Sequence, residues 1–136
     1  MKNIILILSF LVILNLQANA LEGPMELGQF SISLEVKDIK KSQKFYQKLG
    51  FTEIAGNVDQ KWLILQNETN STVIGLFQDE WQGFKLTFNP KDVRSIQKKL
   101  KQQGIKFEVE ATGTSGPAHA ELKDPDGHVI LLDQHN

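Results

Sequence analysis

The feature that most constrains the fold of this chain is an internal repeat at a fixed spacing. Asp38 and Asp92 are 92 − 38 = 54 residues apart. The same offset relates four further pairs: Leu34 and Phe88, Ile39 and Val93, Gly50 and Gly104, Phe51 and Ile105. A repeat of this length is one supersecondary unit used twice. The sequence therefore predicts two similar modules, at about residues 29–80 and 83–134.

Each module contains one amphipathic helix, predicted over residues 39–49 and 90–103. In both segments apolar side chains recur at three- and four-residue spacings, as on the buried side of a helix. The first stripe consists of Ile39, Ser42, Phe45, Tyr46 and Leu49. Asp38 is placed to cap the first helix. Asn89 is expected to cap the second, with Pro90 at its first helical position.

The remaining segments have the alternation typical of strands. Ile32, Leu34 and Val36 alternate with polar side chains over residues 31–36, and residues 84–88 alternate in the same way. Further strands are predicted near residues 51–56, 61–66, 72–77, 105–110, 119–123 and 128–133. The predicted fold class is therefore α+β: two βαβββ modules form a half-open, barrel-like sheet around a concave cavity, with the helices outside.

The first twenty residues predict a secretory signal peptide. Lys2 precedes an apolar run from Ile4 to Leu16, and small residues stand at Ala18 and Ala20. The run is shorter than the roughly 20 residues that span a bilayer. We therefore expect cleavage after Ala20 and an exported protein, periplasmic or secreted, with no membrane association afterwards. An uncleaved N-terminal anchor is the alternative.

Composition excludes several kinds of chemistry. The chain has no cysteine, which excludes disulfides, thiolate metal sites and a cysteine nucleophile. Its net charge is −1, so bulk electrostatics do not indicate a nucleic-acid partner. Residues 21–28 show no periodicity and are interpreted as a flexible lead-in. Residues 111–117 form a loop rich in small residues, which could act as a mobile lid over the cavity.

The repeated unit resembles the vicinal oxygen chelate superfamily, which includes glyoxalase I, bleomycin-resistance proteins and extradiol dioxygenases. The resemblance covers about residues 30–133, nearly all of the chain after the signal peptide. Its carriers are Leu34-x-Val36-x-Asp38, then Ser42-x-x-Phe45-Tyr46-x-x-Leu49-Gly50-Phe51, and the terminal Asp124-Pro125-Asp126-Gly127-x-Val129-Ile130. The resemblance implies the paired-module fold and favours a homodimer.

The resemblance also implies four metal-ligand positions, usually His or Glu, on the first and last strands of each module. Here these positions are Ser31, Gly75, Lys85 and Leu131. Divalent metals of this class need imidazole or carboxylate ligands. Serine is a poor ligand, glycine and leucine offer none, and an ammonium group repels a cation. We therefore expect no metal and no cofactor at these positions.

The candidate ligand-binding residues follow from the strand alternation. Because Ile32, Leu34 and Val36 face the helix, their neighbours face the cavity. The full set is Ser31, Ser33, Glu35, Trp62, Phe77, Lys85, Thr87, His119 and Leu131. Lys85 could receive an anionic group, or it could instead pair with Glu35. Trp62 and Trp81 could supply flat apolar walls, or simply pack in the core or at the rim. His119 and Glu121 share a face of one strand.

Three functions are compatible with these residues. The first is an exported, metal-free protein that binds an unknown small molecule, similar in mode to the bleomycin-resistance branch. The second is a metal-dependent lyase, isomerase or dioxygenase with a displaced metal site around His119 and Glu121. The third is an interaction module whose cavity is filled by side chains.

Overall fold

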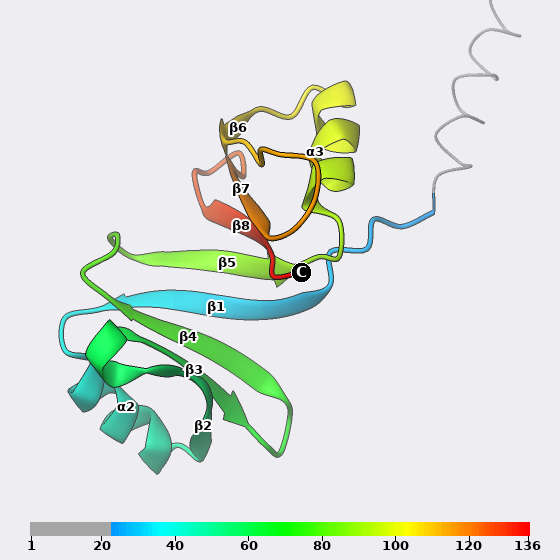
Figure 1. Cartoon of the computed structure of the whole chain (residues 1–136). Helices are drawn as coiled ribbons and strands as arrows, with labels where there is room; N and C mark the ends of the chain where they lie inside the picture. Colours follow the sequence, from blue (N-terminus) through cyan, green and yellow to red (C-terminus); the bar gives the residue numbers. More distant parts are fainter. Residues whose placement is uncertain (1–22) are drawn as a thin grey trace, which may run out of the picture.

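The computed structural model describes residues 23–136 (Figure 1). The predicted signal peptide, residues 1–20, lies outside the described residues. Within the described part of the chain, no helix is long and apolar enough to cross a membrane.

Two modules with the same element order make up the fold. The first contains β1 (Gln29–Val36), α2 (Ile39–Lys48), β2 (Phe51–Asn57), the short 3-10 helix η1 (Val58–Gln60), β3 (Trp62–Asn67) and β4 (Thr72–Gln78). The second contains β5 (Phe84–Asn89), α3 (Val93–Gln102), β6 (Phe107–Val109), β7 (Ala118–Lys123) and β8 (Val129–Gln134). The predicted βαβββ repeat is confirmed, and η1 is an addition that the sequence pattern did not predict.

All eight strands form one sheet in the order β2-β3-β4-β1-β5-β8-β7-β6. Within each module the first and last strands are parallel, β1 with β4 and β5 with β8. The modules join through the antiparallel pair β1 and β5. Figure 1 shows α2 and α3 on the outside of the bent sheet, one on each module. The sheet is open at β2 and β6, so the predicted α+β architecture with outer helices is confirmed.

The two helices begin at equivalent aspartates. Asp38 accepts the Lys41 N–H at 3.0 Å, which confirms the predicted cap and lowers the pKa of its carboxyl below the ordinary value. Asp92 accepts the Ser95 N–H at 2.9 Å, so α3 starts at Val93. The predicted start at Pro90 with an Asn89 cap was wrong. The 54-residue repeat already paired Asp92 with Asp38.

Each helix covers its own hydrophobic core. Under α2 the buried core consists of Ile39, Leu63, Leu65, Ile74 and Leu76. Under α3 it consists of Val93, Ile96, Ala120, Leu122 and Leu132. The inner, concave side of the sheet therefore stays free of the main cores.

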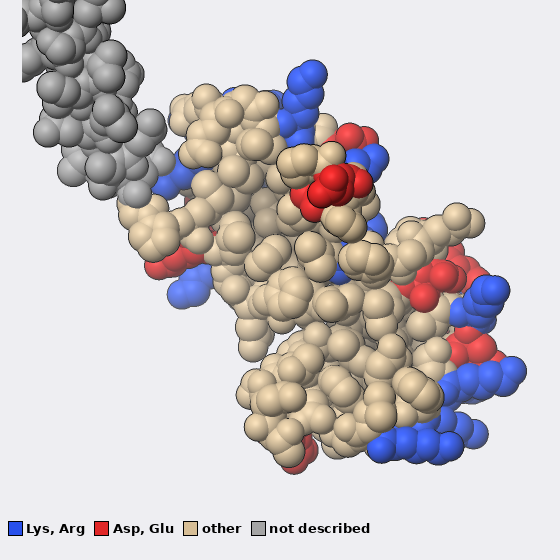
Figure 2. Space-filling view, turned by 180° about the vertical axis from the view of Figure 1, so that it is seen from behind, with Lys and Arg blue, Asp and Glu red and all other residues tan. Residues whose placement is uncertain are grey.

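The predicted stripe of α2 is buried only in part. Ile39 and Tyr46 pack on the core, but Phe45 and Leu49 are 57% and 55% exposed. At about 100° per residue, Phe45 lies about 240° around the helix from Ile39, on its flank. Exposed lysines occupy the outer face of α2 and gather at the lower right edge of Figure 2: Lys40, Lys41, Lys44 and Lys48.

The described part of the lead-in, residues 23–28, has no helix or strand. Met25 and Leu27 nevertheless pack against the core of the second module. Gly28 then turns the chain into β1 at a φ of 75°, and a Cβ there would lie 2.0 Å from the Asn89 carbonyl oxygen. Only glycine fits this close approach, so the segment before β1 is fixed against the strand that begins the α3 connection.

Glutamines at the ends of the last strands tie both modules to their helices. Gln78 accepts the Ile39 N–H through Oε1 at 3.0 Å, and Gln134 accepts the Val93 N–H at the same distance. These two N–H groups belong to the first helical turn and have no partner within the helix. The glutamines are 134 − 78 = 56 residues apart, so the offset grows by two residues between the first and last strands of a module.

We expect Gln134→Leu to lower the free energy of unfolding by about 1–2 kcal/mol, since it leaves the buried Val93 N–H without an acceptor. Gln78→Leu is the matched control and should cost less, because its hydrogen bond is only partly buried. Urea unfolding monitored by circular dichroism measures both. Equal losses in the two variants would contradict the role of burial.

Candidate functional site

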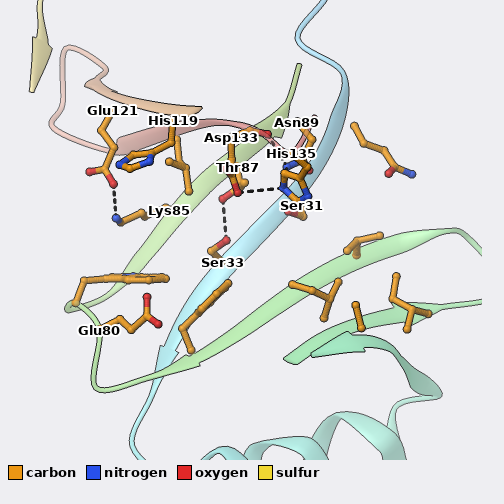
Figure 3. Close-up of a pocket in the computed structure, with 18 of the residues that line it drawn as sticks. Ser31, Ser33, Glu80, Lys85, Thr87, Asn89, His119, Glu121, Asp133 and His135 are labelled. Atoms are coloured by element: carbon orange, nitrogen blue, oxygen red, sulfur yellow. Dashed lines mark hydrogen bonds and ion pairs between the residues drawn. The ribbon is translucent and has the colours of Figure 1, made fainter. Parts of the chain in front are cut away.

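An open cavity of about 620 Å³ lies on the concave side of the sheet, opposite the helices (Figure 3). Its lining comes from both modules and from seven of the strands. The lining residues are Gln29, Ser31, Ser33, Ile54, Ala55, Ile64, Gln66, Val73, Phe77, Glu80, Trp81, Lys85, Thr87, Asn89, His119, Glu121, Leu131, Asp133 and His135. A volume of this size is within the range of small-molecule sites.

The centre of the cavity floor is a hydrogen-bonded hydroxyl pair. Ser33 Oγ and Thr87 Oγ1 are 2.7 Å apart, and both residues are buried. They are related by the module repeat, since 87 − 33 = 54. Two hydroxyls can share one hydrogen bond and still leave one O–H free to donate. The floor therefore offers a donor and acceptors to a ligand, but no charge.

The four positions implied by the family resemblance surround this hydroxyl pair. In one row across the sheet, Thr87 pairs with Ser31 on β1 and with Leu131 on β8. In the neighbouring row, Ser33 pairs with Gly75 on β4 and with Lys85 on β5. Gly75 and Leu131 are also equivalent by the glutamine offset, since 131 − 75 = 56. The strand register thus supports the alignment of all four positions.

Gly75 leaves a gap that an aromatic ring fills. A Cβ built on Gly75 would lie 2.6 Å from Cε2 of Phe77 and 3.4 Å from Cδ1 of Ile64. The Phe77 ring therefore lies directly over the backbone where the resemblance implies a ligand side chain. The ring itself is 4.9 Å, centre to centre, from that of Trp81. These two rings form an aromatic wall on the first module.

Lys85 carries the positive charge at the floor, and its partner is Glu121. The Lys85 Nζ lies 2.5 Å from Oε1 of Glu121 and 4.4 Å from the centre of the Trp81 ring. The two charged side chains are only 15% and 21% exposed. The alternative pairing of Lys85 with Glu35 is wrong. Glu121 comes from β7 of the same module, where its register partner is Leu131.

Most of the predicted site residues line this cavity: Ser31, Ser33, Phe77, Lys85, Thr87, His119 and Leu131. Glu35 and Trp62 do not, so their predicted placement is corrected. Glu35 lies near the end of β1, where its N–H bonds to the Gly83 carbonyl and Phe77 is its register partner. Trp62 begins β3, and Ile64 and Gln66 are the residues of that strand that reach the cavity.

Several lining residues were not predicted. Asn89 and Asp133 continue the alternation by one step beyond Thr87 and Leu131, and His135 by one more. Extending the period of two to the strand ends finds all three. Trp81 and Glu80 lie between β4 and β5, where no periodicity exists to indicate their direction.

The donor set of the cavity does not fit the metal that the family resemblance implies. The four equivalent positions provide a hydroxyl, no side chain, an ammonium and an alkyl group. A displaced site is not formed either: within residues 23–136, no three His, Asp or Glu side chains are placed to hold an ion. His119 and Glu121 both line the cavity, but Glu121 is engaged by Lys85.

The loop at residues 111–117 is not a lid over this cavity, contrary to one expectation from its composition. Arg94 of α3 donates hydrogen bonds to its backbone carbonyls, at Thr112, Gly113, Ser115 and Gly116. None of the loop residues lines the cavity. Arg94 therefore holds the loop on the helix side of the second module.

Comparison with known proteins agrees with this geometry. A family model described as Glyoxalase/Bleomycin resistance protein/Dioxygenase superfamily matches residues 28–132. A comparison with curated protein sequences gave no match.

Three solved structures illustrate the similarity of fold. Methylmalonyl-CoA epimerase from Mycobacterium tuberculosis has a TM-score of 0.63 at 19% identity, covering 85% of this chain and 94% of its own. A superfamily member from Vibrio splendidus 12B01 has a TM-score of 0.60 at 17% identity, covering 78% and 97%. A structure described as NAD-dependent benzaldehyde dehydrogenase from Legionella pneumophila has a TM-score of 0.67 at 19% identity, covering 79% and 100%.

At these identities the structures support the fold alone. The family model, in contrast, spans most of the chain and both modules. The chain therefore belongs to the glyoxalase/bleomycin resistance protein/dioxygenase superfamily.

Proposed function

We propose that this chain is a metal-free binding protein that holds a small molecule in its concave cavity. The observation that carries the proposal is the floor of that cavity. Its four family ligand positions are Ser31, Gly75, Lys85 and Leu131, while the space above them is open and about 620 Å³ in volume. A cavity that keeps its volume but not its metal donors supports binding rather than metal chemistry.

The mixed lining also supports ligand binding over a purely structural module. Small-molecule sites combine apolar walls with a few convergent polar groups. Here an aromatic pair and aliphatic side chains lie opposite hydroxyls, an amide and charged groups. In an interaction module with a filled cavity, side chains would pack into this space.

Two measurements on the purified protein test the proposal. Elemental analysis of protein purified without chelator should find no stoichiometric zinc, nickel, manganese or iron. A thermal-shift screen of small molecules should find compounds that raise Tm in a saturable way, as expected when a ligand binds only the folded state. One tightly held metal ion per chain would instead favour the alternative, a metal-dependent lyase, isomerase or dioxygenase.

A cavity-filling variant makes the screen specific. Ala55 lines the cavity, whereas Thr52 lies on the same strand and does not. We expect Ala55→Trp to abolish the ligand-dependent rise in Tm and Thr52→Trp to retain it. If both variants respond like the unsubstituted protein, the compounds bind elsewhere and the cavity is not the site.

We also propose that the protein works outside the cytoplasm. The support is the layout of residues 1–20, with one lysine, an apolar run and small residues before the expected cleavage point. N-terminal sequencing of the protein from its native host is expected to begin at Leu21. A native protein that begins at Met1 would remove this part of the proposal.

A further inference from the structure

The cavity has two chemically different walls. Its apolar residues come mainly from the first module and the connection that follows it: Ile54, Ala55, Ile64, Val73, Phe77 and Trp81. Its ionisable residues come mainly from β5 and the second module: Lys85, His119, Glu121, Asp133 and His135. In Figure 3 the labelled polar side chains of the second module lie together on one side of the cavity. A ligand that matches both walls has an apolar body and a polar head.

The charges of the lining decide the sign of that head. Three carboxylates line the cavity, on Glu80, Glu121 and Asp133, against one ammonium, on Lys85. With the histidines neutral the sum is 1 − 3 = −2. Lys85 and Glu121 neutralise each other. Glu80 and Asp133 have no Lys or Arg partner within residues 23–136, so an anionic head would meet net repulsion.

Asp133 is the better placed of the two remaining carboxylates. Its Oδ2 lies 3.1 Å from His135 Nε2, and the same ring nitrogen lies 3.0 Å from Asn89 Nδ2. Asn89 Nδ2 also donates to the Asp133 carbonyl oxygen at 3.1 Å. An amide nitrogen only donates, so a neutral His135 accepts from Asn89 through Nε2. That nitrogen then has no proton to give to the Asp133 carboxylate.

The neutral state of His135 therefore leaves a carboxylate at the cavity wall without a donor. A carboxylate in this state gains most from a ligand N⁺–H group, because charge-assisted hydrogen bonds are the stronger ones. The aromatic wall of Phe77 and Trp81 lies across the cavity, on the first module. A flat apolar body fits against such rings.

We infer that the ligand class is an amphipathic amine, with a flat apolar body on the Phe77–Trp81 wall and an ammonium group on Asp133. This inference rests on the proposed binding function and names the chemistry that the cavity selects. The Ser33–Thr87 hydroxyl pair lies between the two walls and can accept further hydrogen bonds from the ligand.

Three indole compounds with the same body and different heads test the sign of the charge. Tryptamine is a cation, tryptophol is neutral and indole-3-propionate is an anion at pH 8, where the histidines are neutral. Dissociation constants come from NMR titration of the mature protein, residues 21–136, at low salt. We expect tryptamine to bind about tenfold more tightly than tryptophol and indole-3-propionate to bind more weakly than both.

Two matched variants then locate the ammonium group. Asp133→Asn should weaken tryptamine about tenfold and leave tryptophol unchanged, which also shows that the variant is folded. Glu80→Gln removes the same charge from another part of the lining and should have a smaller effect. Equal loss in both variants would overturn the role of Asp133.

The failure of this inference is distinguishable from the failure of the proposed function. Tryptophol binding as tightly as tryptamine overturns the amine class and leaves a binding cavity in place. Tighter binding of indole-3-propionate overturns it too, and identifies Lys85 as the receiving group. No saturable tryptamine binding, in a protein that takes up other compounds in the thermal-shift screen, also overturns it. Only a protein that binds nothing in the screen contradicts the binding function itself.

Discussion

Replacing Lys85 with methionine is expected to lower the free energy of unfolding by about 2 kcal/mol. Methionine keeps the length of the side chain but leaves the Glu121 carboxylate without its cation. Because that carboxylate is only 21% exposed, water repays little of the lost interaction. Breaking a fully buried ion pair costs more, about 3–5 kcal/mol, and the partial exposure of this pair reduces the figure. Urea unfolding at pH 7 measures the change.

The double variant Lys85→Met with Glu121→Leu is the decisive control. It removes both charges, so no unpaired group remains near the cavity floor, and most of the lost stability should return. Glu121→Gln alone should cost less than Lys85→Met, since the amide oxygen still accepts from Nζ and the ammonium keeps its contact with the Trp81 ring. A double variant as unstable as Lys85→Met would show that the pair does not act as a unit.

The duplication predicted the fold because it links local pattern to topology. One strand, one capping aspartate and one helix, repeated at 54 residues, leave room for three more strands in each module. The start of the second helix was wrong because Asn89 and Pro90 are individually good signals for a helix start. The structure uses Asp92 instead, since β5 continues through Asn89 and its amide bonds to β8.

The site was predictable where strands alternate and not where the chain turns. Period-two alternation placed Ser31, Ser33, Lys85 and Thr87 correctly, because each points to the face opposite the helices. The same rule failed for Glu35, near the end of β1. The partner of Lys85 was also beyond reach, since the choice between Glu35 and Glu121 depends on how strongly the sheet bends. That curvature leaves no pattern in a single sequence.

The strand register makes a second large prediction: the metal site can be restored. Ser31, Lys85 and Leu131 flank the Ser33–Thr87 pair, so ligand side chains at these three positions converge above it. The triple variant Ser31→His, Lys85→His, Leu131→Glu supplies two imidazoles and a carboxylate, the ligand set of an open zinc site. Removing Lys85 also frees Glu121. We expect one zinc ion per chain with a Kd below about 10 µM, or about 7 kcal/mol of binding free energy.

Calorimetric titration with zinc separates this outcome from binding elsewhere. The control triple variant Ser31→Asn, Lys85→Asn, Leu131→Gln has polar side chains of similar size without strong zinc ligands, and it should bind zinc no better than the unsubstituted chain. Saturable zinc binding by the unsubstituted chain at the same affinity would contradict the proposed absence of a metal site. A folded His, His, Glu variant that binds no zinc would contradict the register of the floor.

The fourth position shows why point changes alone did not preserve a metal in this chain. Gly75→Glu should add affinity to the triple variant only when Phe77 is shortened to alanine, because the Phe77 ring occupies the space that the new side chain needs, 2.6 Å from its Cβ. Gly75→Glu with Phe77 intact should force the ring into the cavity and cost about 1–3 kcal/mol of stability. The aromatic wall and a glutamate at this position are therefore mutually exclusive. A cavity lined for a flat apolar ligand excludes the fourth metal ligand by packing as well as by chemistry.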